Sequence, residues 1–445
     1  MQLEDLVTEV LQQARQRGAT AGDVLIATGD SFSAGVRFGK IEKIHNAHEK
    51  RMGLRLFAGR SSAITSTANF TREALTALVE ETVNLAKATA ADNFSGLPEA
   101  EDFAQNFPDL HLSDPNTLTP EDKIALAREA EAAALSADSR ITNSEGAEFS
   151  NGAREVLYAN SLGFLGRYDT TSYSLSVVPV ASQNGAMQRD YWYSAHRKLS
   201  KLEPATRIGQ IAAERTTRRL GARRVKTQEA PVVFDPEMAA SLLRHLAGAV
   251  SGSALYRKTS FLLDKLDQKI AATGIWIDDD AHIPSALGSK PFDGEGLPTR
   301  RTPVVEDGVL TSYLLDTYSA RKLGLRSTGS ASRSFADVPS ASPTNFFLRP
   351  GTTSPEEIIR SVRSGLYVTE LSGFGVNPVT GDYSRGAVGL WIENGELAFP
   401  VEEITIAGNL LAMFQNIEVI GNDLALRGTI AAPTLKIARM TIAGE

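Results

Sequence analysis

The sequence contains no cysteine among its 445 residues. This absence excludes disulfide bonds, cysteine nucleophiles and every zinc site that uses a thiolate ligand. Histidine is also scarce, so a metal site built on imidazoles must draw on His45, His48, His111, His196, His245 and His282. Only the segments around these histidines are candidates for an imidazole-based metal site.

The sequence also lacks a net positive charge and long apolar runs. The formal net charge is -7, so the chain has no overall positive field that would draw it onto nucleic acid. No run of about 18 apolar residues could cross a bilayer, and Glu4 and Asp5 lie where a signal peptide carries positive charge. We therefore expect a cytoplasmic protein that binds neither membranes nor nucleic acid directly.

The composition, 42% hydrophobic and 22% charged, is typical of a globular protein. A chain of 445 residues is long enough for two or three domains. In residues 1–92, an amphipathic helix precedes short β-rich pieces and a second helix, and the same order recurs in residues 118–226. The second unit opens with the strong helix start Thr119–Asp122, TPED. We predict two helix–β-meander–helix units, without a residue-level repeat between them.

The chain changes character near residue 230. One helix is predicted from Asp235-Pro236 to about Val250, and short strands with Gly- and Pro-containing turns follow to the end. We predict a β-rich domain with few helices over residues 230–445. The fold class expected for the whole chain is α+β, with the two units forming an N-terminal lobe and the β-rich domain a C-terminal lobe.

The helix predicted after Asp235 carries one histidine, in the stretch SLLRHLAGAVSGSALYRK. A zinc-peptidase helix has two histidines on one face and a glutamate that activates the zinc-bound water. The positions one turn away from His245 are Ser241 and Ala249, so this helix offers no second ligand. A metal ligand is one interpretation of His245, but the ligand count favours a packed or partner-facing side chain.

Two groups of acidic and histidine residues also invite a metal-binding interpretation. The segment WIDDDAHIP, with Asp278–Asp280 and His282, either binds a divalent cation or forms a solvated turn that ends a strand. His45 and His48, in KIHNAHEK, either share a helical face or lie exposed at a hairpin tip, as their strand-like surroundings favour. In both groups we expect the second arrangement, which needs no further ligand.

Three more segments have a functional and a simpler explanation. The run Arg215–Lys226 (RTTRRLGARRVK) either complements a helix dipole or forms a docking patch for an acidic partner or a peptide carboxylate. The run Ser327–Ser332 (STGSAS) lacks the lysine and helix of a phosphate cradle and suggests a flexible loop over a cleft. Asp293 and Glu295 in FDGEG are an acid pair for an independent hydrolase or, as the glycines indicate, part of a structural turn.

Three long segments of the C-terminal half resemble one family. They are PFDGEGLPTRRTPVVEDGVLTSYLLDTYSARKLG (291–324), SPTNFFLRPG (342–351) and GFGVNPVTGDYSRGAVGLWIENGELAFPVEEITIAGNLLAMFQNIEVIGND (373–423). Their order and residues are similar to those of the TldD/PmbA family, the so-called modulators of DNA gyrase. Together with the helix–meander–helix start, the resemblance covers nearly the whole chain.

This resemblance bears on the helix that contains His245. In the TldD branch, a histidine-glutamate-x-x-x-histidine helix and a cysteine near the C-terminus belong to a zinc peptidase for small or unfolded peptides. The PmbA branch, also called TldE, lacks both. Here Arg244, His245 and Ala249 fall near the ligand and glutamate positions, within one residue of register, and the end of the chain has no cysteine. The sequence therefore resembles the PmbA/TldE branch.

The resemblance implies a non-catalytic subunit that shapes the peptide cleft of a TldD-type zinc metalloprotease. Zinc is expected on the TldD-like partner and not on this chain, and the substrates are expected to be unfolded peptides. Without its partner, the chain is expected to form a homodimer. An alternative is a peptide-binding or scaffolding homodimer that acts without proteolysis. The candidates for lining the peptide cleft are Arg244, His245, Ser327, Thr328, Gly329 and Arg333.

Overall fold

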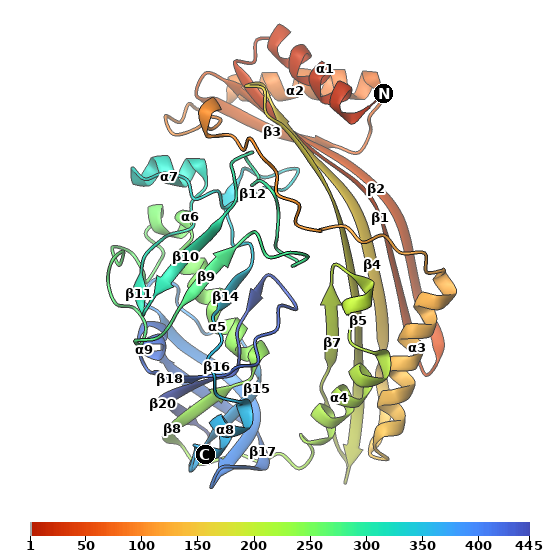
Figure 1. Cartoon of the computed structure of the whole chain (residues 1–445), viewed down its shortest axis with the longest axis vertical. Coiled ribbons are helices and arrows are strands. Elements are labelled where there is room, and N and C mark those ends of the chain that lie inside the picture. Colours follow the sequence, from red (N-terminus) through yellow and green to blue (C-terminus); the bar gives the residue numbers. More distant parts are fainter. Residues whose placement is uncertain (1) are drawn as a thin grey trace.

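The computed structural model describes residues 2–445. A long, curved antiparallel sheet forms the N-terminal lobe, and a β-rich C-terminal lobe lies against one side of it (Figure 1). The first unit of the sheet consists of α1 (Leu3–Gln16), β1 (Ala21–Arg37), β2 (Lys40–Ala58), β3 (Ser61–Thr67) and α2 (Arg72–Ala88). The second consists of α3 (Pro120–Ala137), β4 (Ile141–Asn160), β5 (Leu165–Gln183), β6 (Ala186–Arg189), β7 (Trp192–His196) and α4 (Ala205–Thr217).

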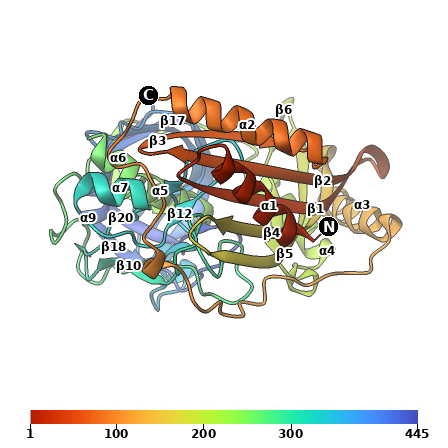
Figure 2. The ribbon, with the colours of Figure 1, turned by 90° about the horizontal axis from the view of Figure 1, so that it is seen from above.

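The two units share one sheet, because β1 and β4 pair along most of their length. The strand order is β3-β2-β1-β4-β5-β6, with β7 also paired to β5, and the β1–β4 register runs from Asp23 opposite Asn160 to Val36 opposite Ala147. Helices α1 and α2 lie over the strands of the first unit (Figure 2). Helices α3 and α4 pack on each other and on β4 and β5 of the second unit.

The strands are longer than the short pieces expected from the sequence. Residues 21–37 form one strand, β1, which continues through Gly29 and Asp30. A Cβ atom on Gly29 would lie 2.2 Å from the carbonyl oxygen of Ala153 on β4. Glycine is therefore needed here for close approach of two strands, and not for a change of chain direction.

The helix predictions of the N-terminal lobe are confirmed to within a few residues. In α3, the Thr119 side chain accepts a hydrogen bond from the Asp122 N–H, and the Asp122 carboxylate accepts one from the Thr119 N–H. This capping box satisfies backbone donors that the first turn cannot pair internally. The helices bury apolar stripes that include Leu6, Val10 and Val79 against the sheet.

The C-terminal lobe contains two sheets with α5 (Pro236–Ala249) packed against both. The larger sheet has the order β17-β16-β15-β8-β20-β18 and closes on itself through β17 and β20. Its strands are β8 (Gln228–Phe234), β15 (Ser364–Ser372), β16 (Asp382–Glu393), β17 (Glu396–Asn409), β18 (Ile417–Ile420) and β20 (Leu435–Ala443). The smaller sheet, in spatial order, is β11 (Val309–Leu310), β10 (Arg301–Glu306), β9 (Ile277–Asp280), β14 (Phe346–Leu348) and β19 (Ile430–Ala431).

Short elements connect these sheets: α6 (Gly252–Tyr256), α7 (Thr317–Leu323), α8 (Pro355–Arg360), α9 (Leu410–Gln415) and the hairpin of β12 (Ala331–Ser332) with β13 (Ser340–Ala341). The main hydrophobic core of the lobe joins α5 to strands of both sheets. The predicted α+β class, with a helix–meander–helix N-terminal lobe and a β-rich C-terminal lobe, is confirmed. Within residues 2–445, no helix is long and apolar enough to span a membrane.

Two local expectations were wrong. His45 and His48 are exposed, as expected, but they lie within the long strand β2 and not at a hairpin tip. Asp278 and Asp279 do not belong to a solvated turn, because they are buried in β9 with exposed fractions of 1% and 2%. Asp278 forms ion pairs with arginines of the neighbouring segments, and Asp279 accepts the N–H and hydroxyl hydrogen bonds of Thr344.

Candidate functional site

Helix α5 presents an open face beside its buried stripe. Its first turn is fixed by Asp235, whose carboxylate accepts the Met238 N–H at 2.9 Å, and by Pro236 at the first helical position. Leu242, Leu243 and Leu246 are buried on the inner side. Arg244 and Gly248 are exposed on the outer side, with His245 half-buried next to them.

His245 packs against strand β16. Its ring meets the Tyr383 ring edge to face, with 6.3 Å between the centroids. Burial lowers the pKa of His245, and the positive charges of Arg385 and Arg244 lower it further. A neutral imidazole is therefore favoured at this position.

The N-terminal lobe holds the beginning of α5 in place through polar contacts. The Tyr193 hydroxyl on β7 lies 3.2 Å from both carboxylate oxygens of Glu237. The Arg215 guanidinium on α4 lies 3.3 Å from Asp235 and 3.4 Å from Asp190. The outer face of α5 therefore has a fixed position relative to the edge of the long sheet.

The arginine-rich segment 215–226 has a buried beginning and an exposed end, where Arg223, Arg224 and Lys226 lie. Arg215 and Arg219 are largely buried between the lobes, and Arg219 donates to Glu370 at 2.6 Å. Arg218 lies beside them, and burial lowers its pKa, with a further decrease from the positive charge of Arg215. The start of this segment therefore joins α4 to the C-terminal lobe.

The predicted loop 327–333 is anchored rather than free. The Ser327 and Thr328 hydroxyls donate to the carbonyl oxygen of Leu315, and the Thr328 hydroxyl also accepts the Leu315 N–H at 2.7 Å. Gly329 has φ of +69°, and a Cβ there would lie 2.3 Å from the carbonyl oxygen of Pro298. The loop is therefore part of the packed C-terminal lobe and not a flexible cover.

The remaining candidate, Arg333, is buried at the lobe junction, where it forms an ion pair with Asp23 of β1. The structure thus divides the six candidates into two separate groups. Arg244 and His245 lie on α5 near Tyr383, whereas the 327–333 segment contacts Leu315, Pro298 and, through Arg333, the N-terminal sheet.

A network of buried charges extends from Arg333 and was not expected from the sequence. Asp23 is 0% exposed and accepts hydrogen bonds from Arg55 at 2.8 Å and from the Tyr158 hydroxyl at 3.3 Å. Glu295 of the C-terminal lobe lies 3.8 Å from Arg55. The only signal in the sequence is the position of charged residues inside otherwise apolar strand segments, such as Arg55 in GLRLFA.

The carboxylates of Asp293 and Glu295 accept hydrogen bonds from backbone N–H groups. Asp293 accepts backbone N–H groups from Glu295, Leu297 and Ala331. Glu295 accepts the Thr317 N–H at 2.8 Å. These contacts agree with the expectation of a structural turn in FDGEG.

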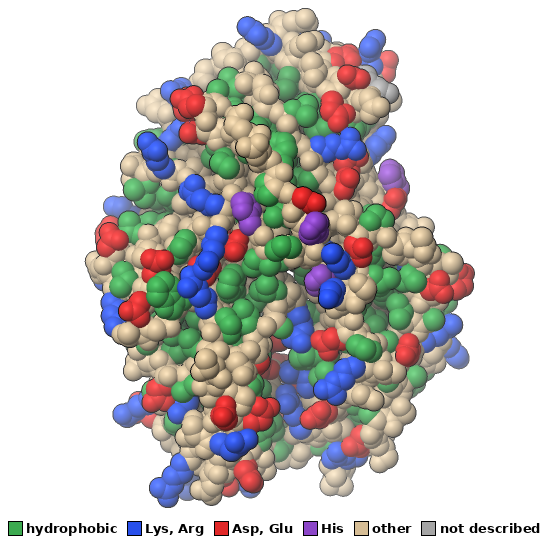
Figure 3. Space-filling view, in the orientation of Figure 1, with side chains coloured by type: hydrophobic (Ala, Val, Ile, Leu, Met, Phe, Trp, Pro, Cys, Tyr) green, Lys and Arg blue, Asp and Glu red, His purple; other side chains and the backbone are tan. Residues whose placement is uncertain are grey.

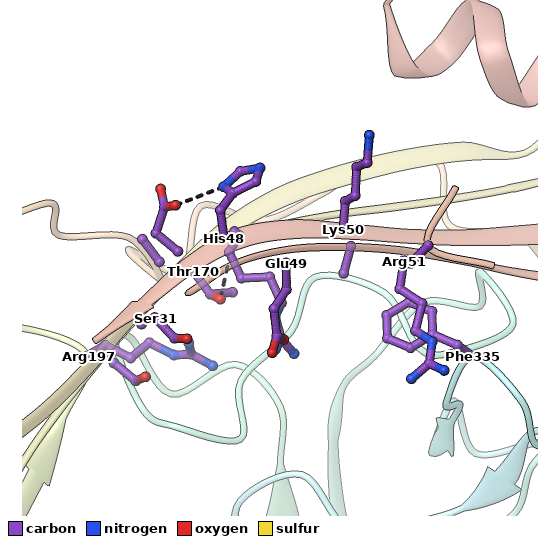
Figure 4. Close-up of a pocket in the computed structure, with 16 residues that line it drawn as sticks. Ser31, His48, Glu49, Lys50, Arg51, Thr170, Arg197 and Phe335 are labelled. Atoms are coloured by element: carbon purple, nitrogen blue, oxygen red, sulfur yellow. Dashed lines mark hydrogen bonds and ion pairs between the residues drawn. The ribbon is translucent and has the colours of Figure 1, made fainter. Parts of the chain in front are cut away.

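A cavity of about 690 Å³ lies between the long sheet and the C-terminal loop that carries Phe335. Glu49, Arg51 and Arg197 point into this space. His48 and Lys50 alternate with Glu49 and Arg51 along β2 and point away from the opposite face of the strand (Figure 4). Small side chains form the floor: Ala27, Gly29, Ser31, Gly152, Thr170 and Ser172. The surface is hollowed between the lobes, with basic side chains along the hollow (Figure 3).

Comparison with known proteins identifies the family. Three family models match in order: PmbA/TldA metallopeptidase domain 1 over residues 22–86, the central domain over 113–220 and the C-terminal domain over 227–444. The metalloprotease PmbA of Escherichia coli O157:H7 is 38% identical over 443 residues, which cover 100% of this chain and 96% of that protein. The chain belongs to the PmbA/TldD family.

Solved structures agree with this assignment. A putative modulator of DNA gyrase from Bacteroides thetaiotaomicron has a TM-score of 0.93 and 30% identity, with 99% of each chain covered. TldE from Thermococcus kodakarensis, at 21% identity, has the same fold, with a TM-score of 0.89 and coverage of 99% of this chain and 100% of that one. The resemblance to the TldD/PmbA family seen in the sequence is confirmed.

The residues present on α5 do not fit the zinc ion of a PmbA/TldD-family peptidase. A protein zinc site needs at least three side-chain ligands, drawn from neutral imidazoles, carboxylates and thiolates. Helix α5 offers one imidazole, His245, beside the guanidinium of Arg244 and the methyl group of Ala249. Across residues 2–445, no three or more His, Asp or Glu side chains form a group that could hold a metal ion.

Proposed function

We propose that this chain is a non-catalytic, PmbA/TldE-like subunit of a TldD-type zinc metalloprotease that acts on small unfolded peptides. The observation that supports the proposal is the outer face of α5, where His245 is the one imidazole of the helix and lies beside the exposed Arg244, without a second zinc ligand. Water bound to zinc ionises near neutral pH only where a metal is held. The role left to this chain is to form a wall of the peptide cleft and to orient the peptide.

The long sheet has an edge suited to that role. Strand β3 pairs with residues 52–58 of β2, and within residues 2–445 no strand pairs with the outer edge of residues 40–51. An extended peptide can add to such an edge through backbone hydrogen bonds, with little dependence on its side chains. Binding of this kind suits unfolded peptides of varied sequence.

A cleavage assay with the two chains separate and mixed tests the proposal. With casein or a short peptide as substrate, we expect no cleavage by this chain alone and restored cleavage after addition of a TldD-like, zinc-bearing homologue. Cleavage by this chain alone that survives a chelator would overturn the proposal.

Variants of the α5 face sharpen the assay. The change Arg244→Ala with His245→Ala is expected to reduce cleavage by the mixture by about tenfold, because positioning of a substrate alone contributes several kcal/mol to catalysis. The zinc content of the mixture is expected to stay the same. Arg72→Ala is the matched control, since Arg72 is an exposed arginine on α2, far along the chain from α5.

The alternative is a peptide-binding or scaffolding homodimer without proteolysis. Exposed sheet edges are commonly covered by symmetric dimers, and we expect the purified chain to form a homodimer through its C-terminal lobe. Light scattering at micromolar concentration measures this state. Co-purification from cell extract separates the two functions, because only the protease subunit requires a second, zinc-bearing chain of similar size.

A further inference from the structure

A second cavity, of about 400 Å³, lies where the two lobes meet the linker that follows α2. We call it the junction pocket. Its walls come from β2 and β3, from the linker around Asp92, and from α6 and α7, which supply Tyr256 and Tyr318. Its volume falls in the range of about 300–1,000 Å³ that is typical of small-molecule sites.

Two buried carboxylates line the junction pocket, and each has an oxygen without a hydrogen-bond donor in the protein. Asp316 is 3% exposed; its Oδ1 accepts the Ser319 N–H, but its Oδ2 receives no hydrogen bond or ion pair from residues 2–445. Glu295 is 1% exposed; its Oε2 accepts the Thr317 N–H, and its Oε1 has Arg55 at 3.8 Å, beyond hydrogen-bond distance. Neither oxygen is among the fully buried acceptors of the described residues, so both are open to a donor inside the pocket.

The neighbouring cations of the protein do not supply those donors. Arg55 directs its Nε and Nη2 groups to Asp23. Arg60 and Arg257 line the pocket as exposed side chains, with hydrogen bonds to the Ser95 carbonyl oxygen and the Tyr256 hydroxyl. Glu295 therefore has an ion pair with Arg55 but no hydrogen bond to its Oε1, and a bound cation can donate hydrogen bonds to both carboxylates.

The form of the pocket favours an ammonium group over a metal ion. Within the described chain, no third His, Asp or Glu joins the two carboxylates in a metal-binding group. The Tyr256 and Tyr318 rings pack edge to face, with 5.6 Å between their centroids, and aromatic faces attract organic cations. Ser253 and Ser340 add hydroxyl groups that can bind the amide groups of a peptide.

We propose that the junction pocket binds the free amino terminus of a short peptide, with Glu295 and Asp316 accepting hydrogen bonds from its α-ammonium group. Arg60 and Arg257 are placed to bind a peptide carbonyl or carboxylate group closer to solvent. The inference rests on the proposed function in taking peptides as the ligands. It assigns to this chain a specificity for free amino termini that the sheet edge alone does not provide.

Calorimetric titration of the purified full-length chain with trialanine and with N-acetyl-trialanine tests this inference. We expect trialanine to bind and the acetylated peptide to bind at least about tenfold more weakly, as for loss of a charge-assisted hydrogen bond. Glu295→Gln is expected to weaken trialanine binding by a similar factor. Because Glu295→Gln alters the lobe junction, Ser253→Phe provides a second variant, which fills the pocket without removing a charge.

Glu129→Gln is the matched control, because Glu129 is an exposed glutamate on α3 that lies outside both the junction pocket and the β2 edge, and it is expected to leave trialanine binding unchanged. Equal binding of the two peptides, unchanged binding by Ser253→Phe, or no binding of trialanine at millimolar concentration would overturn the inference. The titration uses this chain alone and measures no cleavage. A failed titration therefore leaves the cleavage result of the mixed chains intact, and a failed cleavage assay leaves the titration intact.

Discussion

The outer face of α5 and the junction between the lobes differ in how deeply their charged side chains are buried. On α5, Arg244 is exposed and His245 is half-buried, in edge-to-face contact with a tyrosine ring. At the junction, Asp23, Arg55 and Glu295 are 0%, 6% and 1% exposed. The buried charges lie where the lobes meet, and the face that would carry zinc in a peptidase has no comparable network.

This difference is informative because buried charges are costly unless each has a partner. Asp23 has Arg55 on β2 and Arg333 of the C-terminal lobe as partners, so this carboxylate has both of its ion pairs only when the lobes are together. Arg197 adds hydrogen bonds from the N-terminal lobe to the carbonyl oxygens of Ala286 and Leu287. We infer that the two lobes act as one rigid body, which suits a subunit that forms the wall of a cleft.

The largest expected effect comes from breaking the junction. Asp23→Asn leaves Arg333 buried without its ion-pair partner and Arg55 with only Glu295, at 3.8 Å, and we expect the free energy of unfolding to fall by about 3–5 kcal/mol. Asp30→Asn is the matched control on the same strand. Asp30 pairs with His48 in an exposed position, and its loss is expected to cost about 1 kcal/mol or less.

Urea denaturation of the two variants and the wild type measures these changes. Similar losses of unfolding free energy for Asp23→Asn and Asp30→Asn would contradict the contrast between the buried ion pairs of the junction and the exposed pair on the surface.

A smaller effect is expected in the pH dependence of stability. Burial raises the pKa of Glu295, opposed by the positive charge of Arg55 and the Thr317 N–H and supported by the negative charges of Asp293 and Asp316, from 4.5 to about 7. Because the folded state holds this proton more tightly, the stabilisation is present below about pH 4.5 and is lost as the pH rises through about 7. We expect the wild type to lose on the order of 2–3 kcal/mol relative to Glu295→Gln between pH 5 and 8.

Comparison with Glu295→Gln removes this group together with its interaction with Asp293, whose pKa is also raised by burial. Burial also raises the pKa of Asp235 and of Asp279 to about 6, but both groups titrate in the wild type and the variant and cancel in the difference. Denaturation curves at several pH values give the result. A stability difference that does not change with pH would show that Glu295 does not titrate in this range.

The smallest effect on stability is expected on α5. His245→Ala removes a half-buried ring that has no hydrogen bond among residues 2–445, and we expect a loss of about 1 kcal/mol or less. Thermal unfolding compares this variant with Leu246→Ala, a buried neighbour on the same helix, for which we expect a loss of about 2–5 kcal/mol. A larger loss of stability for His245→Ala than for Leu246→Ala would indicate that the imidazole belongs to a binding site.

The contrast between the two regions also explains what the sequence predicts. Helices such as α3 and α5 are predictable because their signals are local: a capping residue, a proline in the first turn and an apolar period of 3.6 residues. The missing second ligand on α5 is equally local, because it depends on residues one turn from His245. Family, fold class and the altered helix were therefore within reach of the sequence.

The junction was not predictable because its partners are distant in the chain. Asp23 pairs with Arg55, 32 positions away, and with Arg333, 310 positions away. The length of β1 was missed for a related reason, since Gly29 is required by the approach of Ala153 and not by its own neighbours. The burial of Arg215 and Arg219 was not predictable either, because acidic partners such as Glu370 lie on other strands.

The zinc content of the purified chain tests the central claim most directly. Elemental analysis after dialysis is expected to give far less than one zinc ion per chain, because one imidazole on α5 cannot fill a tetrahedral coordination shell. The same analysis of a TldD-like homologue provides the positive control. About one zinc ion per chain, lost after His245→Ala, would contradict the account and identify α5 as a metal site.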